Sequence, residues 1–334
     1  MASPRGKGIF PETHPLYLGV TGFGQHSVVQ EYMRKNPPRR ILVLGTRLGE
    51  GTSYWDPSMV PSKGFIHVDI NSSVPGVAFP AAPTFAVHAE IGAFLTDVIA
   101  RLPPAPRGPA NAYVLADSFS REHLCASPGR VRPQYLMAEI QRTIVESTDA
   151  LVMAEAGNSF AWAVHFLRIP TAGRYRMSMR MGSMGHMTAG VIGAAQARNG
   201  KAVAIVGDGA MLMTCEISTA VHHQIPAVWI VLNDSRYNMC HQGMETLGLQ
   251  GADADIPMTD FTMLARSMGA HGVRVECERD LREALLAALK VKGPFVVDVL
   301  INPDERAPTE KRNQGLKAIS EKEAQTLSFP KMGS

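Results

Sequence analysis

The feature that most constrains the fold is a series of short apolar runs that alternate with helix-like segments in the second half of the chain. The runs are ALVMAEAG, KAVAIVGDG, PAVWIVLND, HGVRVE and PFVVDVLI. Apolar runs of this length without polar alternation are typical of strands that are buried on both faces of a parallel sheet. The sequence therefore predicts an α/β fold with parallel sheets flanked by helices.

A segment rich in proline and glycine, PPAPRGPANAY, divides the chain. Before it, RRILVLG and GFIHVDI are strand candidates, and AVHAEIGAFLTDVIARL has helical spacing of apolar residues near its end. We therefore expect a small α/β domain over residues 1–103, a linker over 104–131 and a larger α/β domain over 132–302. The polar tail, 303–334, is interpreted as a flexible extension or as an arm that packs on a partner.

Composition excludes several classes of protein. With 33 Lys and Arg against 30 Asp and Glu, the net charge is +3, and no basic run indicates binding to nucleic acid. No apolar stretch predicts a membrane span or a signal peptide. The four cysteines have no C-x-x-C spacing, which argues against disulfides and structural zinc and favours a reducing compartment, so we expect a cytoplasmic protein. They are Cys125, Cys215, Cys240 and Cys277.

Gly207-Asp208-Gly209 ends one of the predicted strands. In a parallel α/β sheet, ligands bind beyond the carboxyl ends of the strands. The two glycines allow the backbone to approach a bulky anion, and the amides of Ala210 and Met211 then point at phosphate oxygens. A carboxylate beside phosphate requires a bridging cation, and Mg²⁺ takes carboxylates, carbonyl oxygens and phosphates together.

The next predicted strand ends in Asn233-Asp234, with 23 residues between Gly209 and Asn233. That length fits one helix and one strand, so both strand ends reach the same edge of the sheet. An isolated G-D-G is more simply a tight turn, and an isolated N-D is more simply a helix cap. Because a strand, a helix and a second polar strand end coincide here, we predict a magnesium–diphosphate clamp.

The stretch from G-D-G to N-D resembles the motif of thiamine-diphosphate enzymes. GSMGHMTAGVIGAAQA and AEAGNSFAWA are similar to other segments of that family, and KGIFPETHPLYLGVTGFG, LVLGTRLGEGTS and IHVDIN are similar to the central domain of its acetolactate synthase group. The resemblance covers residues 7–302. It implies thiamine diphosphate and Mg²⁺ as cofactors, a diphosphate-binding domain over 132–302 and a partial central domain over 1–103.

The resemblance also implies roles for single residues. Asp208 and Asp234 would bind Mg²⁺ through their side chains and Arg236 through its carbonyl, although Asp234 stands where the family more often has asparagine. Met184 would hold the cofactor in its bent form. The expected catalytic region comprises Met184, Met239, His186 and His241, although lone histidines more often have structural roles. The expected cofactor-binding residues are Gly157, Asn158, Ser159, Gly182, Met184, Gly207, Gly209, Ala210, Met211, Asp234, Asn238 and Met239.

The resemblance does not extend to the pyrimidine-binding domain of this family, which carries the glutamate that activates the cofactor. We therefore expect a second subunit with that domain, together with self-association through the diphosphate-binding domain. We expect no FAD on this chain alone, because GTRLGEGTSYWDPSMV departs from the sequence of the FAD-binding members. Gly243 aligns with a large tryptophan of acetolactate synthases, which predicts a wider pocket and a larger substrate.

The leading hypothesis is a subunit of a split, ThDP- and Mg²⁺-dependent 2-oxo acid decarboxylase or carboligase, similar to acetolactate synthase. One alternative is a simple 2-oxo acid decarboxylase subunit. Another is a non-catalytic regulatory partner of a ThDP enzyme. A nucleotide-binding module that uses LVLGTRLGEG is disfavoured, because the stretch has neither G-x-G-x-x-G spacing nor a P-loop lysine.

Overall fold

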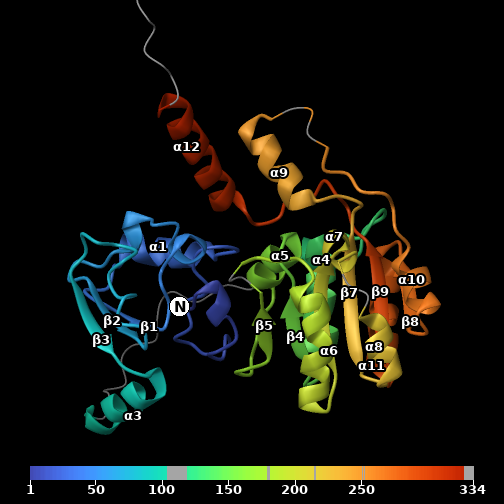
Figure 1. The fold of residues 1–334 in the computed structure, drawn as a ribbon, viewed down its shortest axis with the longest axis horizontal. Helices are drawn as coiled ribbons and strands as arrows, with labels where there is room; N and C mark the ends of the chain where they lie inside the picture. The colour runs from blue at the N-terminus through green and yellow to red at the C-terminus, as the bar shows by residue number, and fades with distance from the viewer. Residues whose placement is uncertain (104–118, 179–180, 214–215, 250, 252, 327–334) are drawn as a thin grey trace, which may run out of the picture. The chain divides into compact units, whose positions relative to one another are not determined.

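The computed structural model describes residues 1–103, 119–178, 181–213, 216–249, 251 and 253–326, which form two compact units (Figure 1). Among these residues the first unit holds 1–4 and 14–103, and the second holds 5–13 and 119–326. Most of the predicted linker lies outside the described residues. Its described end, 119–131, belongs to the second unit, as do residues 5–13, which the sequence analysis had assigned to the first domain.

The first unit contains a three-stranded parallel sheet of order β1-β2-β3. The sequence pattern predicts β1 and β2 correctly, but the last residues of β3 fall within the helix predicted after it. That helix begins at Ile91 because Glu90 caps it, with carboxylate oxygens that accept hydrogen bonds from the Gly92 and Ala93 amides at 2.8 and 2.7 Å. The elements are α1 Ser27–Lys35, β1 Ile41–Leu44, α2 Glu50–Ser53, β2 Phe65–Asp69, β3 Thr84–His88 and α3 Ile91–Arg101, with the 3₁₀ turns Pro4–Gly6 and Pro57–Met59.

The second unit contains a six-stranded parallel sheet of order β5-β4-β6-β7-β9-β8. Five of its strands are the predicted apolar runs, and the fold class is confirmed. The exception is β5, which has only three residues and no clear apolar pattern. The strands are β4 Leu151–Ala154, β5 Tyr175–Met177, β6 Ala202–Gly207, β7 Ala227–Asn233, β8 His271–Val275 and β9 Phe295–Leu300.

Helices cover both faces of this sheet (Figure 1). On one face lie α6 His186–Arg198, α8 Ile217–His222 and α10 Phe261–Ser267. The others that pack on the sheet are α4 Pro133–Ile140, α5 Asn158–Phe166 and α11 Glu278–Lys290, and a π-helical turn, Gln141–Val145, continues α4. Beyond the carboxyl ends of the strands lie α7 Asp208–Met211, α9 Asn238–Leu247 and α12 Glu310–Thr326, and a 3₁₀ turn spans Glu122–Leu124.

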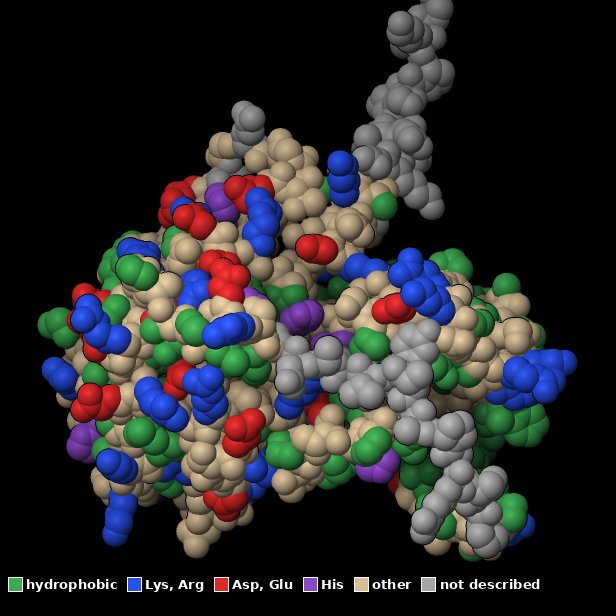
Figure 2. All heavy atoms as spheres, turned by 180° about the vertical axis from the view of Figure 1, so that it is seen from behind, with side chains coloured by type: hydrophobic (Ala, Val, Ile, Leu, Met, Phe, Trp, Pro, Cys, Tyr) green, Lys and Arg blue, Asp and Glu red, His purple; other side chains and the backbone are tan. Residues whose placement is uncertain are grey.

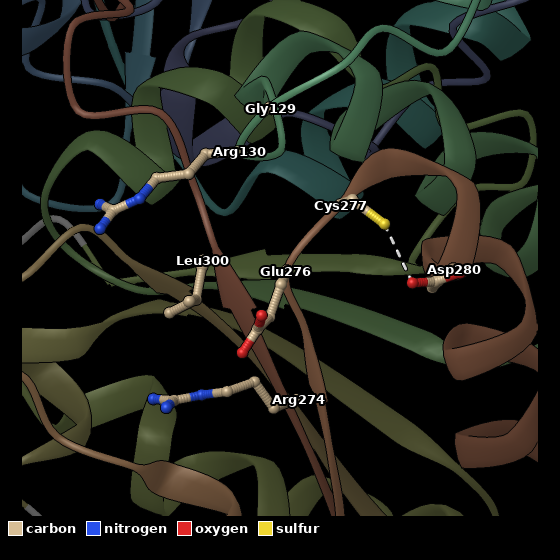
Figure 3. Close-up of a pocket in the computed structure, with 7 residues that line it drawn as sticks. All are labelled: Gly129, Arg130, Arg274, Glu276, Cys277, Asp280 and Leu300. Carbon is tan, nitrogen blue, oxygen red and sulfur yellow. Dashed lines mark hydrogen bonds between the residues drawn. The ribbon is translucent and has the colours of Figure 1, made fainter.

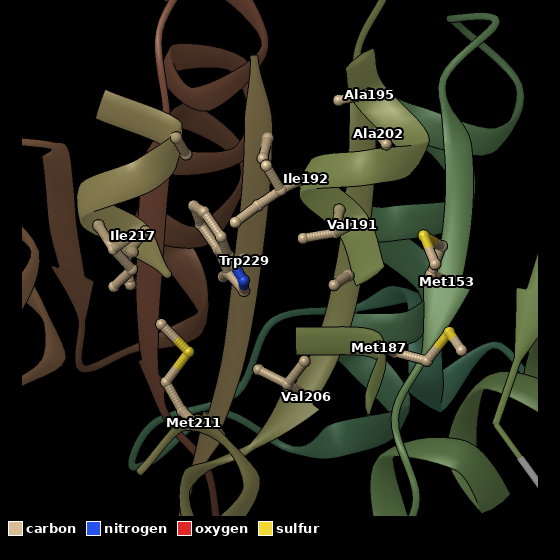
Figure 4. Close-up of a cluster of buried hydrophobic side chains, with 14 of the residues drawn as sticks. Met153, Met187, Val191, Ile192, Ala195, Ala202, Val206, Met211, Ile217 and Trp229 are labelled. Carbon is tan, nitrogen blue, oxygen red and sulfur yellow. The ribbon is translucent and has the colours of Figure 1, made fainter. Parts of the chain in front are cut away.

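Trp229 is the largest side chain in the core beneath α6 and α8 (Figure 4). It lies on β7 between Ile217 of α8 and Val191 and Ile192 of α6, and it is fully buried. Its Nε1 donates a hydrogen bond to the Thr188 carbonyl oxygen at 2.8 Å. The indole thus contributes a large buried apolar surface and still satisfies its one polar atom, which fixes the beginning of α6 against the sheet.

Residues 5–13 are anchored in the second unit by a buried ion pair. Lys7 and Glu12 have fully buried side chains, and Lys7 Nζ lies 2.7 Å from Glu12 Oε2 and 2.7 Å from the Leu167 carbonyl oxygen. Glu12 Oε2 also accepts a hydrogen bond from the Ile169 amide at 3.0 Å. Burial lowers the pKa of Lys7, which the charge of Glu12 partly offsets. This compensated pair explains why the segment belongs to the second unit.

Candidate active site at the carboxyl edge of the sheet

Asp208 joins the ends of two neighbouring strands. It follows β6 and begins the short helix α7, and its carboxylate is buried. Oδ1 accepts a hydrogen bond from the Gly209 amide at 2.7 Å, and Oδ2 accepts bonds from the Ser235 and Arg236 amides at 2.7 and 3.3 Å. Burial nevertheless raises the pKa of Asp208, although these amides act in the opposite direction. The predicted convergence of the G-D-G and N-D strand ends is therefore present.

Asp234 follows β7 on the same edge. Burial and the nearby negative charge of Asp208 raise its pKa to about 7, although a hydrogen bond from Asn238 acts in the opposite direction. A carboxylate whose ionisation is disfavoured by a second carboxylate beside it is stabilised when a divalent cation lies between the two. Carboxylate and carbonyl oxygens are the ligands that Mg²⁺ prefers.

The loop after Asp234 is tightly packed on Gly209. A β-carbon at Gly209 would lie 2.5 Å from Cε1 of Tyr237, so only glycine fits there. Arg236 has its side chain paired with Asp255 at 2.6 Å, and its carbonyl oxygen accepts a hydrogen bond from the Asn238 amide at 2.8 Å. A carbonyl oxygen has two lone pairs, so the Arg236 carbonyl retains one for a cation.

The beginning of α5 provides the second part of the site. Gly157, with φ of 115°, precedes the helix, and the position of its absent β-carbon faces open space. Asn158 has a buried Oδ1 atom without a hydrogen-bond partner. The Ser159 hydroxyl donates to the Glu155 carbonyl oxygen at 3.0 Å, so that side chain is already engaged. The leading amides of a helix have no partner within the helix and are suited to bind phosphate.

Glu155 is a residue that the sequence analysis missed. Its buried Oε2 accepts hydrogen bonds from the Met187 amide at 2.8 Å and from the amide and hydroxyl of Thr188, both at 3.0 Å. It therefore caps α6 from the end of β4 and fixes the segment that follows Met184. An acidic residue at the end of a buried strand was the available signal. Its partners, Met187 and Thr188, lie 32 and 33 residues away in the sequence.

Met184 and its neighbours form an exposed apolar rim, which we define as Met181, Met184, Leu212 and Met213. Their exposed fractions are 88%, 43%, 44% and 54%. Met181 and Met184 lie next to Leu212 and Met213, because a β-carbon at Gly185 would lie 3.1 Å from Cβ of Met213. The rim is therefore one continuous surface beside the clamp.

The side chains of three predicted site residues, His186, His241 and Met211, contact other groups or lie in the core. His186 Nδ1 lies 2.7 Å from the Ser178 hydroxyl, and His241 Nε2 lies 3.5 Å from Glu245 Oε1. Met211 is fully buried in the core, so its side chain is excluded from a cofactor site and only its backbone amide remains for that role. On α9, Met239 is half-buried.

Gly243 does not open a pocket on the side that its missing side chain would occupy. A β-carbon there would lie 3.5 Å from Nη1 of Arg312 and 3.9 Å from Cδ1 of Leu316. Both belong to α12, which packs beside α9 (Figure 1). The sequence argument for a wider pocket is therefore wrong on this side, because the C-terminal helix fills the space. In the described part of the tail, α12 packs on α9 of its own chain.

The residues present fit thiamine diphosphate and Mg²⁺. The Oδ1 atoms of Asn158 and Asn238 are buried without partners, and the absent β-carbons of Gly157, Gly182 and Gly207 all face open space. Such polar atoms and open backbone suit a polar, anionic ligand. Across the described ranges, no group of three or more His, Cys, Asp or Glu residues is placed to hold a metal.

A separate pocket lies at the carboxyl ends of β8 and β9 (Figure 3). Its volume is about 690 Å³, and Cys277 donates a hydrogen bond to Asp280 at 2.9 Å on one side of it. Its lining residues are Gly129, Arg130, Arg274, Glu276, Cys277, Asp280 and Leu300. None of the residues predicted to bind the cofactor or metal lines it, so it is distinct from the clamp. Of the four cysteines, Cys215 lies outside the described residues and the others are free.

Two further observations concern the charged side chains on the surface and the length and apolar character of the helices. On the face of the second unit seen in Figure 2, basic and acidic side chains are interspersed. In the part of the chain that the structure describes, no helix combines the length and apolar character that crossing a membrane requires.

Comparison with protein families agrees with the fold. Residues 155–299 match the C-terminal TPP-binding domain of thiamine pyrophosphate enzymes, and residues 1–98 match the central domain of the same enzymes. The chain therefore belongs to the thiamine pyrophosphate enzyme family. Membership implies thiamine diphosphate as the cofactor.

Within this family the chain is acetolactate synthase-like. It is 31% identical to the putative acetolactate synthase large subunit IlvB2 of Mycobacterium tuberculosis, over 92% of this chain and 55% of that protein. It is 25% identical to the acetolactate synthase isozyme 1 large subunit of Escherichia coli, over 90% and 53%. The chain thus spans about half the length of the curated relatives it matches.

A solved structure has the same fold. The thiamine diphosphate-dependent 4-hydroxybenzoylformate decarboxylase of Rhodococcus jostii RHA1 matches with a TM-score of 0.72 and 22% identity, over 89% of this chain and 55% of that one.

Proposed function

We propose that this chain is a subunit of a split, ThDP- and Mg²⁺-dependent 2-oxo acid decarboxylase or carboligase. The observation that carries the proposal is the pair of carboxylates at the ends of β6 and β7, the buried Asp208 and the partly buried Asp234, with the pKa of Asp234 raised to about 7. A site that concentrates negative charge away from water in this way suits a divalent cation and the diphosphate bound to it.

Each residue has a defined part in this proposal. Asp208, Asp234 and the Arg236 carbonyl bind Mg²⁺, and the first turn of α5 at Asn158 binds the diphosphate end. Met184 orients the cofactor from the loop that Glu155 fixes. Bound thiamine diphosphate supplies the nucleophilic carbon that releases CO₂ from a 2-oxo acid. The chain itself supplies orientation and charge compensation.

The apolar rim supports a second subunit that carries a pyrimidine-binding domain. Its four side chains lie beside the clamp and are 43% to 88% exposed. Clustered exposed apolar side chains next to a polar site are typical of surfaces that bind another protein. We therefore propose that the partner covers the rim and completes the active site, with self-association through the diphosphate-binding domain.

Calorimetry with the Asp208→Ala variant tests the clamp. Loss of a buried carboxylate ligand is expected to weaken Mg²⁺-dependent binding of thiamine diphosphate by more than about 100-fold. The matched control is Asp280→Ala, which removes a carboxylate from the separate pocket and is expected to leave that affinity unchanged. Unchanged affinity in Asp208→Ala, with an intact thermal transition, would contradict the clamp.

Co-purification tests the partner. The chain is isolated from its native cell in buffer with Mg²⁺ and thiamine diphosphate, bound proteins are identified by mass spectrometry, and CO₂ release is measured with a panel of 2-oxo acids. Recovery of a chain with a pyrimidine-binding domain, together with CO₂ release, supports the split enzyme. An aldehyde as the product identifies simple decarboxylation, and an acyloin or 2-hydroxy-2-acyl acid identifies carboligation. Isolation of this chain alone, without turnover, contradicts the proposal.

A further inference from the structure

Asn238 makes contacts that the clamp alone does not explain. It is the first residue of α9 and only 7% exposed. Its Nδ2 donates to Asp234 Oδ2 at 2.7 Å and to the Pro303 carbonyl oxygen at 2.9 Å. A side-chain amide has two hydrogens, so both donor positions of Asn238 are used.

The contact makes the two oxygens of Asp234 unequal. Oδ2 is held by the Asn238 amide, which leaves Oδ1 as the oxygen available to a cation without displacing that bond. Carboxylates bind Ca²⁺ through one or both oxygens, in sites of six to eight ligands, whereas Mg²⁺ requires a compact octahedral shell. A carboxylate that is restricted to one oxygen therefore disfavours the larger cation more than the smaller one.

Asn238 is itself fixed by the segment that follows β9. The Asn302 amide donates to the Val131 carbonyl oxygen at 2.9 Å, which fixes the chain next to Pro303. One helical turn further along α9, Gln242 donates to the Glu305 carbonyl oxygen at 3.1 Å and accepts from the Ala307 amide at 3.3 Å. The Asn238 amide thus points at Asp234 from a framework that α9 and the C-terminal segment build together.

We infer that Asn238 is a positioning residue that holds Asp234 as a one-oxygen ligand and thereby favours Mg²⁺ over Ca²⁺. The inference rests on the proposed function, because it assumes that Asp234 binds the cation. It assigns to the C-terminal segment an indirect part in metal selectivity, through the Pro303 carbonyl.

The test measures affinity for thiamine diphosphate by calorimetry, separately with Mg²⁺ and with Ca²⁺. The variants are Asn238→Leu, which keeps a similar volume without a donor, and Asn238→Ala, which removes the amide without adding bulk. The matched control is Gln242→Leu, which breaks the contact between α9 and the C-terminal segment but does not touch Asp234. Thermal unfolding verifies that each variant is folded.

Both Asn238 variants are expected to shift the ratio of the two affinities toward Ca²⁺ by about tenfold, as for other residues that orient a metal ligand. Gln242→Leu is expected to lower the melting temperature and to shift the ratio much less than the Asn238 variants, because Asn238 still donates to Asp234. An unchanged ratio in a folded Asn238 variant would overturn the inference, and so would an equal shift in Gln242→Leu. If the wild-type protein, with its partner, shows no cation-dependent binding at all, the proposed function fails and the inference fails with it.

Discussion

Replacing Asp234 with asparagine is expected to stabilise the metal-free chain at and above neutral pH. Burial and the charge of Asp208 raise the pKa of Asp234 from 3.8 to about 7, so the folded state holds this proton more tightly than the unfolded state. A raised carboxyl pKa means that stability decreases as pH rises from about 4 to about 7 and that the full deficit is present above about pH 7. The Asp234→Asn variant has no such titration and can still face Asn238 with an oxygen atom.

The size of the effect follows from the pKa. A difference from 3.8 to about 7 corresponds to about 4 kcal/mol in total. Of this, about 2.5 kcal/mol develops between pH 5 and pH 8, because at pH 5 the carboxyl group is already largely ionised in the unfolded state and the rest of the difference has developed below that pH. Asp234 is only partly buried by accessible surface, so solvent screening reduces the expected value to about 2 kcal/mol.

Urea unfolding of both proteins at pH 5 and pH 8, with EDTA present, measures the difference. The wild-type chain is expected to lose about 2 kcal/mol more than the variant over this range. Other titrating groups contribute to both proteins and cancel in the comparison. Adding Mg²⁺ and thiamine diphosphate at pH 8 is expected to reverse the order, because the cation stabilises the ionised form of Asp234. Stability profiles that run parallel from pH 5 to pH 8 would refute the reasoning.

Two substitutions test the packing around the clamp. Gly209→Ala places a β-carbon 2.5 Å from the Tyr237 ring, so we expect a loss of about 1 to 3 kcal/mol in urea unfolding and weaker Mg²⁺ binding by calorimetry. Normal stability and affinity would show that the ring moves freely. Glu155→Gln weakens the charged cap on the Met187 and Thr188 amides, and we expect a loss of about 2 kcal/mol by the same method. A loss below about 0.5 kcal/mol would show that the cap contributes little.

The sequence predicted those parts of the site that depend on local pattern. Gly207 and Asn233 end buried apolar strands, and parallel neighbours have their carboxyl ends on the same edge, so the meeting of Asp208 with the β7 end could be deduced. The role of Glu155 could not, because its partners on α6 lie 32 and 33 residues further along the sequence. The contact of Asn238 with Pro303 joins residues 65 apart in sequence.

Other predictions also failed where the local sequence pattern was insufficient. The three-residue strand β5 is too short for a periodic pattern, and β3 merges into the helical pattern that follows it. Gly243 suggested open space because an absent side chain in a sequence does not reveal what fills its place. The C-terminal helix α12 does so here through Arg312 and Leu316.

The buried pair of Lys7 and Glu12 changes how the two units are joined. In the sequence, residues 14–103 of the first unit lie between two parts of the second unit, since residues 5–13 precede them and residues from 119 onward follow them. Residues 14–103 are therefore tethered at each end, as an inserted domain is, and a break in the backbone between residues 103 and 119 would not by itself release them. The N-terminal piece would still be held through Lys7 and Glu12 at Leu167 and Ile169, as a non-covalent clasp.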